Sequence, residues 1–217
     1  MCNEKLWSEL LSLFDDSYEL VHVTIPNKCS FDEIVDSLYF EEQKINLLGF
    51  SLGGYIAAYY AVKYPNRINR LFIMGSTLTS ISEEEIFKRQ VGIDLVSAYG
   101  FKGLSRQKIK SLLADENINN ENLITLIQTM YTDLGEDIFM NQMKSTLKRA
   151  NLIEKLFLLN VPIWFFYSKE DRLLEYNSLM ESTNKNIVIE SIEGNSHMLP
   201  LEKPTLCYNK ISKWIIS

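Results

Sequence analysis

The stretch KINLLGFSLGGYIAAYY, residues 44–60, joins a strand pattern to a helix pattern. Residues 44–49 form an apolar run of the kind found in buried strands. Residues 52–64 are rich in small and aromatic side chains, and we expect a helix there that closes before the following proline. The serine between the two patterns, Ser51, therefore lies at the carboxyl end of a strand and at the start of a helix, which is where parallel α/β folds gather their functional sites.

Ser51 is bracketed by glycines in the motif Gly49-Phe50-Ser51-Leu52-Gly53. Gly-x-Ser-x-Gly by itself also fits a turn with an incidental serine, but strand and helix patterns on its two sides are typical of a sharp turn that exposes a nucleophile. We expect side chains at Gly49 and Gly53 to collide with the neighbouring strand and helix. At the helix N-terminus, the Leu52 N–H would face a developing oxyanion.

The rest of the chain alternates short apolar runs with longer helical patterns, which is typical of an α/β fold with a mostly parallel sheet covered on both faces. We expect further strands over 19–25, 70–75, 161–167 and 187–192. We expect further helices over 4–14, 31–40 and 174–182, and a final helix through Trp214, with Ser30 as an N-cap.

The pattern changes after residue 77. Residues 78–150 contain no convincing strand and offer several helical patterns, interrupted at positions such as Gly135. Ser82 followed by Glu85 predicts a capping box near the start of this segment. We therefore expect a helical cap over 78–150, inserted in a core made of residues 1–77 and 151–217.

A serine hydroxyl needs a general base, and the sequence has only two histidines. His22 lies inside the apolar run 19–25, which favours a structural role within a strand. His197 follows the strand expected over 187–192, on a loop at the carboxyl end of the sheet. Elimination and position both indicate His197 as the base.

The acid that orients this histidine is expected between Ser51 and His197 in chain order, on a loop after a strand. Asp171 meets this condition, because it follows the strand over 161–167. A carboxylate there would hold the imidazole in the productive tautomer. Its neighbour Glu170 is a competitor, and both carboxylates also fit a solvated charge cluster with the adjacent lysine and arginine.

Composition excludes several other classes of protein. The 217 residues carry a net charge of −6 without a basic stripe, which disfavours nucleic acid as a partner. Three scattered cysteines, Cys2, Cys29 and Cys207, indicate reduced thiols rather than disulfides or a zinc site. The absence of a long apolar run or a signal-peptide pattern indicates a cytoplasmic protein without a membrane partner. We expect no metal and no cofactor.

Several stretches resemble the α/β-hydrolase superfamily. Residues 49–57 are similar to the serine turn of its small esterases and carbon–carbon hydrolases, 161–172 resemble its acid loop, and 194–204 resemble its histidine loop with the following Leu-Glu-x-Pro. Residues 142–152 resemble the last cap helix of one bacterial subgroup. The resemblance runs along essentially the whole chain and implies a triad of Ser51, Asp171 and His197.

The resemblance has one departure. Residues 1–7 resemble the segment that follows the His-Gly or Pro-Gly turn of family members, where the second oxyanion N–H is supplied. We expect either a longer gene product, with a strand and a glycine-containing turn upstream, or a shortened member whose sheet has closed up. In the shortened form, the second donor would have to come from Met1, Cys2, Asn3 or a residue of the cap.

The resemblance implies a serine hydrolase that cleaves a small carboxylic ester or thioester through an acyl-enzyme. Carbon–carbon bond hydrolysis with the same triad is the enzymatic alternative. A catalytically impaired binding protein that keeps the fold is the alternative from another class, because fold alone does not establish activity.

Overall fold

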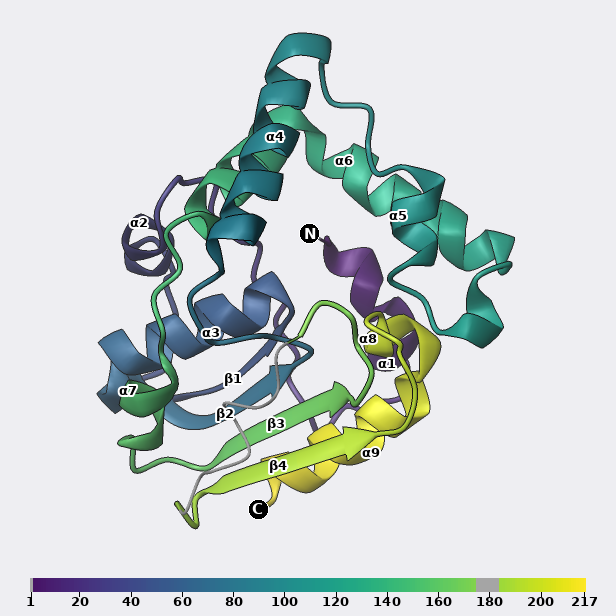
Figure 1. The fold of residues 1–217 in the computed structure, drawn as a ribbon. Coiled ribbons are helices and arrows are strands. Elements are labelled where there is room, and N and C mark those ends of the chain that lie inside the picture. Colours follow the sequence, from purple (N-terminus) through teal and green to yellow (C-terminus); the bar gives the residue numbers. More distant parts are fainter. Residues whose placement is uncertain (1, 175–183) are drawn as a thin grey trace.

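The computed structural model describes residues 2–174 and 184–217. In Figure 1 a twisted sheet lies beneath a group of helices, with further helices on its two faces. The sheet contains β1 (Ile45–Phe50), β2 (Ile68–Met74), β3 (Ile163–Ser168) and β4 (Ile187–Ile192). These strands are parallel and follow the order β1-β2-β3-β4, so the strands predicted near 45–49, 70–75, 161–167 and 187–192 are confirmed.

Alternate residues of the central strands enter two separate cores. Leu71 and Ile73 of β2 pack with α2 (Phe31–Asp36), α3 (Leu52–Lys63) and α7 (Ile153–Phe157) on one face. Phe72 and Met74 pack on the other face. This second core also includes residues of η1 (Glu4–Trp7), α1 (Ser8–Leu11), α8 (Leu199–Glu202) and α9 (Pro204–Ile215).

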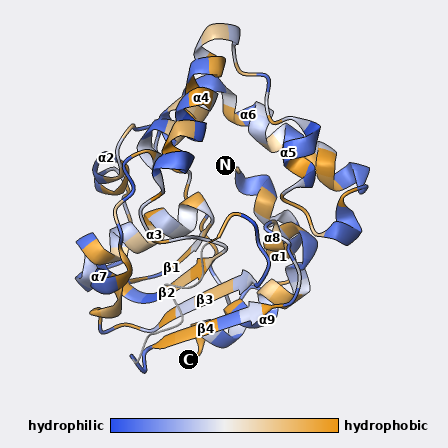
Figure 2. Cartoon of the chain, in the orientation of Figure 1, coloured by the Kyte–Doolittle hydropathy of each residue, from blue (hydrophilic) through white to orange (hydrophobic). Residues whose placement is uncertain are grey.

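Burial on both faces explains why the central strand β3 is a nearly continuous apolar run instead of an alternating one. All six residues of β3 are buried. Figure 2 shows hydrophobic colours over much of the sheet, with paler or hydrophilic stretches in β3 and near the end of β4.

The chain between β2 and β3 is helical. It contains α4 (Glu83–Tyr99), α5 (Arg106–Lys110), η3 (Asp115–Asn117) and α6 (Glu121–Thr146), which gather above the sheet in Figure 1. The described residues 78–150 include no strand, as expected. Gly135 interrupts α6 with φ 75° and ψ 174°, so the predicted break appears as a kink. The division of the chain into a core and a cap stays a prediction.

Predicted helix starts agree with the structure better than predicted helix ends. Ser30 and Ser82 cap α2 and α4, each accepting a hydrogen bond from the backbone N–H three residues on. However, α2 ends at Asp36, short of the predicted residue 40. The helix predicted over 4–14 comprises η1 and α1, and ends at Leu11. The helix predicted over 174–182 lies almost wholly outside the described residues.

The strand predicted over 19–25 is wrong. This segment has no regular secondary structure, and most of its side chains are exposed, including Val21 at 73 %. A β-strand needs a neighbour for its hydrogen bonds, and an isolated run of β-forming residues gains no ladder. Among the described residues β1 pairs only with β2, so the segment has joined no strand. The structural role expected for His22 inside a strand is therefore also wrong.

Candidate active site

The turn between β1 and α3 holds Ser51 in a strained conformation. Its φ is 52° and its ψ is −119°, and it is the only non-glycine residue with positive φ in the described part of the chain. Such a conformation costs on the order of 1–3 kcal/mol and persists only where the surroundings impose it. Here the Ser51 N–H donates to the Met74 carbonyl at 2.9 Å, and the Ser51 carbonyl accepts from the Tyr55 N–H at 3.2 Å.

The glycines of this turn have different roles. A Cβ on Gly49 would lie 2.3 Å from the Gly53 carbonyl oxygen, so β1 and α3 approach too closely for any side chain there. A Cβ on Gly53 would meet nothing within 4 Å, so the predicted collision at Gly53 is wrong. The close approach occurs one residue later, where a Cβ on Gly54 would lie 2.7 Å from Cβ of Ser76.

His197 is the histidine that faces Ser51. It lies in the loop between β4 and α8, and its Nε2 is 3.1 Å from the Ser51 hydroxyl oxygen. Its side chain is buried, with the ring centroid 5.1 Å from that of Phe50. Gly75 lies beside both rings at φ 54°: a Cβ there would come 3.1 Å from Cε2 of Phe50 and into ordinary contact, 3.8 Å, with Cε1 of His197.

Asp171 is the carboxylate that meets the histidine. Its Oδ2 lies 2.7 Å from Nδ1 of His197, and its Oδ1 accepts from the Leu173 N–H at 2.9 Å. The Asp171 side chain is buried, whereas the competitor Glu170 is exposed. The solvated cluster with adjacent charges does not form either, because Lys169 pairs with Glu193 instead.

These contacts define the direction of the hydrogen bonds. A carboxylate can only accept, so the Nδ1–H of neutral His197 donates to Asp171 and leaves the Nε2 lone pair for the Ser51 hydroxyl. The arrangement can therefore withdraw a proton from Ser51 and stabilise the imidazolium that forms. The three residues predicted from the sequence meet at the carboxyl ends of β1, β3 and β4.

The predicted oxyanion donors are Leu52 and either Met1 or Cys2. Leu52 is the first residue of α3, and the first N–H groups of a helix have no partner within it. Cys2 packs at the edge of the core cluster that contains Phe50 and Met198, the neighbours of Ser51 and His197. Met1 lies outside the described residues. The oxyanion roles stay predictions.

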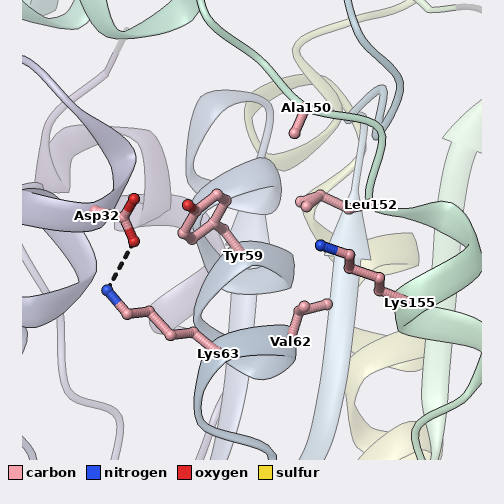
Figure 3. A pocket seen from close by; sticks show the side chains of 7 residues that line it. All are labelled: Asp32, Tyr59, Val62, Lys63, Ala150, Leu152 and Lys155. Carbon is pink, nitrogen blue, oxygen red and sulfur yellow. Dashed lines mark hydrogen bonds and ion pairs between the residues drawn. The ribbon is translucent and has the colours of Figure 1, made fainter.

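A surface pocket lies away from the triad. It has a volume of about 260 Å³ and lies beside the C-terminal half of α3. Its lining residues, shown in Figure 3, are Asp32, Tyr59, Val62, Lys63, Ala150, Leu152 and Lys155. Lys63 is already paired with Asp32 and with Asp36, each at 2.7 Å, so its charge is compensated within the protein.

Other site types find no support in the described residues. They include no cluster of three or more His, Cys, Asp or Glu side chains that could hold a metal ion. Cys2, Cys29 and Cys207 are free thiols. No helix in the described ranges is both long and apolar enough to cross a membrane.

A family profile described as alpha/beta hydrolase fold matches residues 37–108, which include the Ser51 turn. A thermophilic esterase from Thermogutta terrifontis, solved with malate bound, superposes with a TM-score of 0.83 over 99 % of this chain and 85 % of its own, at 19 % identity. The chain has the α/β-hydrolase fold. An enol-lactonase from Burkholderia xenovorans LB400 also shares this fold, with a TM-score of 0.78 over 100 % of this chain and 88 % of its own, at 11 % identity.

One curated protein is similar in sequence over part of the chain. The 2-hydroxymuconate semialdehyde hydrolase of Pseudomonas sp. strain CF600 is 32 % identical over 94 residues, or 43 % of this chain. The chain spans 30 % of that relative's length.

Sequence reasoning missed two residues that shape the site. Gly54 allows the close approach of Ser76, and Gly75 adopts a positive φ next to Phe50, yet neither glycine belongs to the Gly-x-Ser-x-Gly motif. A signal was present in each case: Gly54 forms a glycine pair with Gly53, and Gly75 follows an apolar strand directly. Only the packing of α3 against the loop after β2 shows which glycine is needed.

Proposed function

We propose that the protein is a serine hydrolase that cleaves a small carboxylic ester or thioester through an acyl-enzyme. The observation that carries the proposal is the continuous hydrogen-bonded chain from Asp171 through His197 to Ser51. Its support from known proteins is general: an esterase and an enol-lactonase share the fold, and both names refer to ester bonds.

The reaction follows from the hydrogen-bond directions. Ser51 Oγ attacks the carbonyl carbon while His197 Nε2 takes the hydroxyl proton, and Asp171 stabilises the resulting imidazolium. The tetrahedral oxyanion receives the Leu52 N–H and a second donor from Met1 or Cys2. When the carbon–oxygen or carbon–sulfur bond breaks, His197 returns the proton to the leaving group. Water, deprotonated by His197, then attacks the acyl-enzyme, which releases the acid and restores Ser51.

Carbon–carbon bond hydrolysis is the second candidate, because the curated relative is a semialdehyde hydrolase of that type. It would use the same triad on a diketone or ring-fission product. Ester cleavage is preferred, since the structural match covers nearly the whole chain, whereas the semialdehyde hydrolase matches 43 % of it.

The proposal is tested by steady-state and rapid-mixing hydrolysis of p-nitrophenyl acetate, p-nitrophenyl butyrate and an acyl thioester. We expect turnover with a burst of nitrophenol equal to the enzyme concentration, and its loss in Ser51→Ala and His197→Ala variants that melt cooperatively. Hydrolysis of a 1,5-diketone by the same protein would distinguish the carbon–carbon hydrolase from the esterase. Ligand binding without turnover of any of these compounds would instead favour the binding-protein alternative.

A further inference from the structure

Glu202 gathers three hydrogen-bond donors that the proposed reaction does not use. Its Oε1 accepts from the Ala114 backbone N–H at 2.9 Å and from Nδ2 of Asn117 at 2.8 Å. Its Oε2 accepts from the Ser196 hydroxyl. A carboxylate that accepts several donors forms charge-assisted bonds, roughly twice as strong as neutral ones.

The donors come from two segments that meet beside the candidate base. Ser196 directly precedes His197, whereas Ala114 and Asn117 belong to residues 112–117, between α5 and α6. The same two segments also touch through the backbone. The Leu112 carbonyl accepts from the His197 N–H at 3.0 Å and from the Met198 N–H at 3.3 Å. Glu202 therefore links the histidine loop to residues 112–117 of the helical insertion. The same residues of the insertion also bond to the backbone of His197.

Ser196 is held from both sides. Its hydroxyl donates to Glu202, and its carbonyl accepts from the Ser168 hydroxyl at the end of β3, at 2.6 Å. The backbone before His197 is thus tethered to the sheet by one contact and to the insertion by the other. Without the Glu202 contact, Ser196 would keep its bond to Ser168, and the loop would keep the bonds of His197 and Met198 to the Leu112 carbonyl.

We propose that Glu202 is a positioning residue, which holds the loop so that His197 Nε2 faces Ser51. This inference rests on the proposed function. Glu202 touches none of the three triad residues in the contacts described above and acts through Ser196 and residues 112–117. A displacement of about 1 Å at a reacting group can reduce the rate by on the order of 100-fold, so a small shift of the loop has a measurable effect.

The chain supplies a matched control. Glu116 pairs with Lys203 at 3.0 Å and joins the same segment to the start of α9, but both side chains are well exposed. Exposed pairs of this kind contribute roughly 0–1 kcal/mol and do not fix geometry. Glu116→Ala therefore removes a carboxylate from the same region without touching the histidine loop.

The kinetic test compares Glu202→Ala, Glu202→Gln, Ser196→Ala and Glu116→Ala in ester hydrolysis. Glu202→Ala should lower kcat by on the order of 100-fold with KM within about threefold of wild type, because the transition state is affected more than binding. Glu202→Gln should recover most of the loss, since its amide oxygen still accepts from residues 114 and 117. Ser196→Ala should reproduce part of the defect even if Glu202→Ala does not fold, and Glu116→Ala should behave as wild type.

An imidazole NMR spectrum gives a readout that does not depend on turnover. The chain has only two histidines, and His22 is exposed, so the Nδ1–H of His197 should be the single protected low-field ring proton. We expect this resonance to broaden or vanish in Glu202→Ala and to persist in Glu116→Ala. If wild type hydrolyses nothing, the proposed function fails while this spectrum still tests Glu202. Wild-type kcat and an unchanged resonance in Glu202→Ala would overturn the positioning role.

Discussion

Replacing Gly49 and Gly53 separately with alanine should have opposite effects on stability. Both glycines flank Ser51 in the same five-residue motif, and neither has a positive φ. The new Cβ at position 49 would lie 2.3 Å from the carbonyl oxygen and 2.5 Å from the carbonyl carbon of Gly53. The new Cβ at position 53 would have no neighbour within 4 Å.

The magnitudes follow from these distances. Overpacking a tight site costs typically about 1–3 kcal/mol, and the upper part of that range applies because the atoms near Gly49 are backbone and cannot rotate away. For a domain of this size each kcal/mol shifts Tm by about 2–4 °C, so Gly49→Ala should melt roughly 6–12 °C below wild type. Gly53 lies in the first turn of α3, where alanine is favoured over glycine by up to about 1 kcal/mol, so Gly53→Ala should melt at or slightly above the wild-type temperature.

Thermal unfolding followed by circular dichroism measures both effects, and ester hydrolysis at 20 °C reports whether the turn keeps its shape. We expect Gly49→Ala to lose activity along with stability, because β1 and α3 must separate to admit the methyl group. A Gly49→Ala protein as stable as wild type would contradict the predicted overpacking. A larger loss of stability in Gly53→Ala than in Gly49→Ala would contradict it as well.

Three further substitutions or modifications test other parts of the structure. Ser51→Gly should abolish hydrolysis yet raise the free energy of unfolding by roughly 1 kcal/mol in urea denaturation, because glycine adopts φ 52° without strain; a destabilised variant would contradict this. Asp171→Asn should keep the fold but lower kcat by about 10⁴-fold, since an amide favours the wrong tautomer of His197; near-wild-type kcat would show that Asp171 does not orient the base. Burial raises the pKa of the Cys207 thiol to about 12 and also raises the pKa of the Cys2 thiol. Iodoacetamide at pH 8 should therefore modify only the exposed Cys29 in the native protein, and all three thiols in urea. Peptide mass spectrometry maps the modified positions.

Much of the sheet could be predicted because its strands are locally distinctive. Buried parallel strands form nearly continuous apolar runs, as β3 does, and the half-buried strand β4 has the bounds that its sequence pattern predicts, residues 187–192. The segment 19–25 carries an equally good local pattern, yet it stays outside the sheet because strand formation depends on a partner that no local pattern reveals. Sequence periodicity therefore identified the strands that have neighbours and failed for the one that has none.

The triad residues could be predicted from the sequence for a different reason. With two histidines in the chain, position relative to the strands was enough to select His197, and the loop after β3 offered only Glu170 and Asp171 as nearby acids. The contacts that support the histidine loop could not be predicted from the sequence. Glu202 was visible as part of a family-like motif, but its donors at positions 114 and 117 lie more than 80 residues away in sequence and are brought to it only by packing.

Covalent labelling shows directly whether Ser51 is an activated nucleophile. The protein is incubated with a fluorophosphonate, and the adduct is counted by intact mass and mapped by peptide sequencing. We expect one adduct per chain, on Ser51, which is absent in Ser51→Ala and forms much more slowly in His197→Ala. An adduct on another residue, or none under conditions that fully label a reference serine hydrolase, would contradict it.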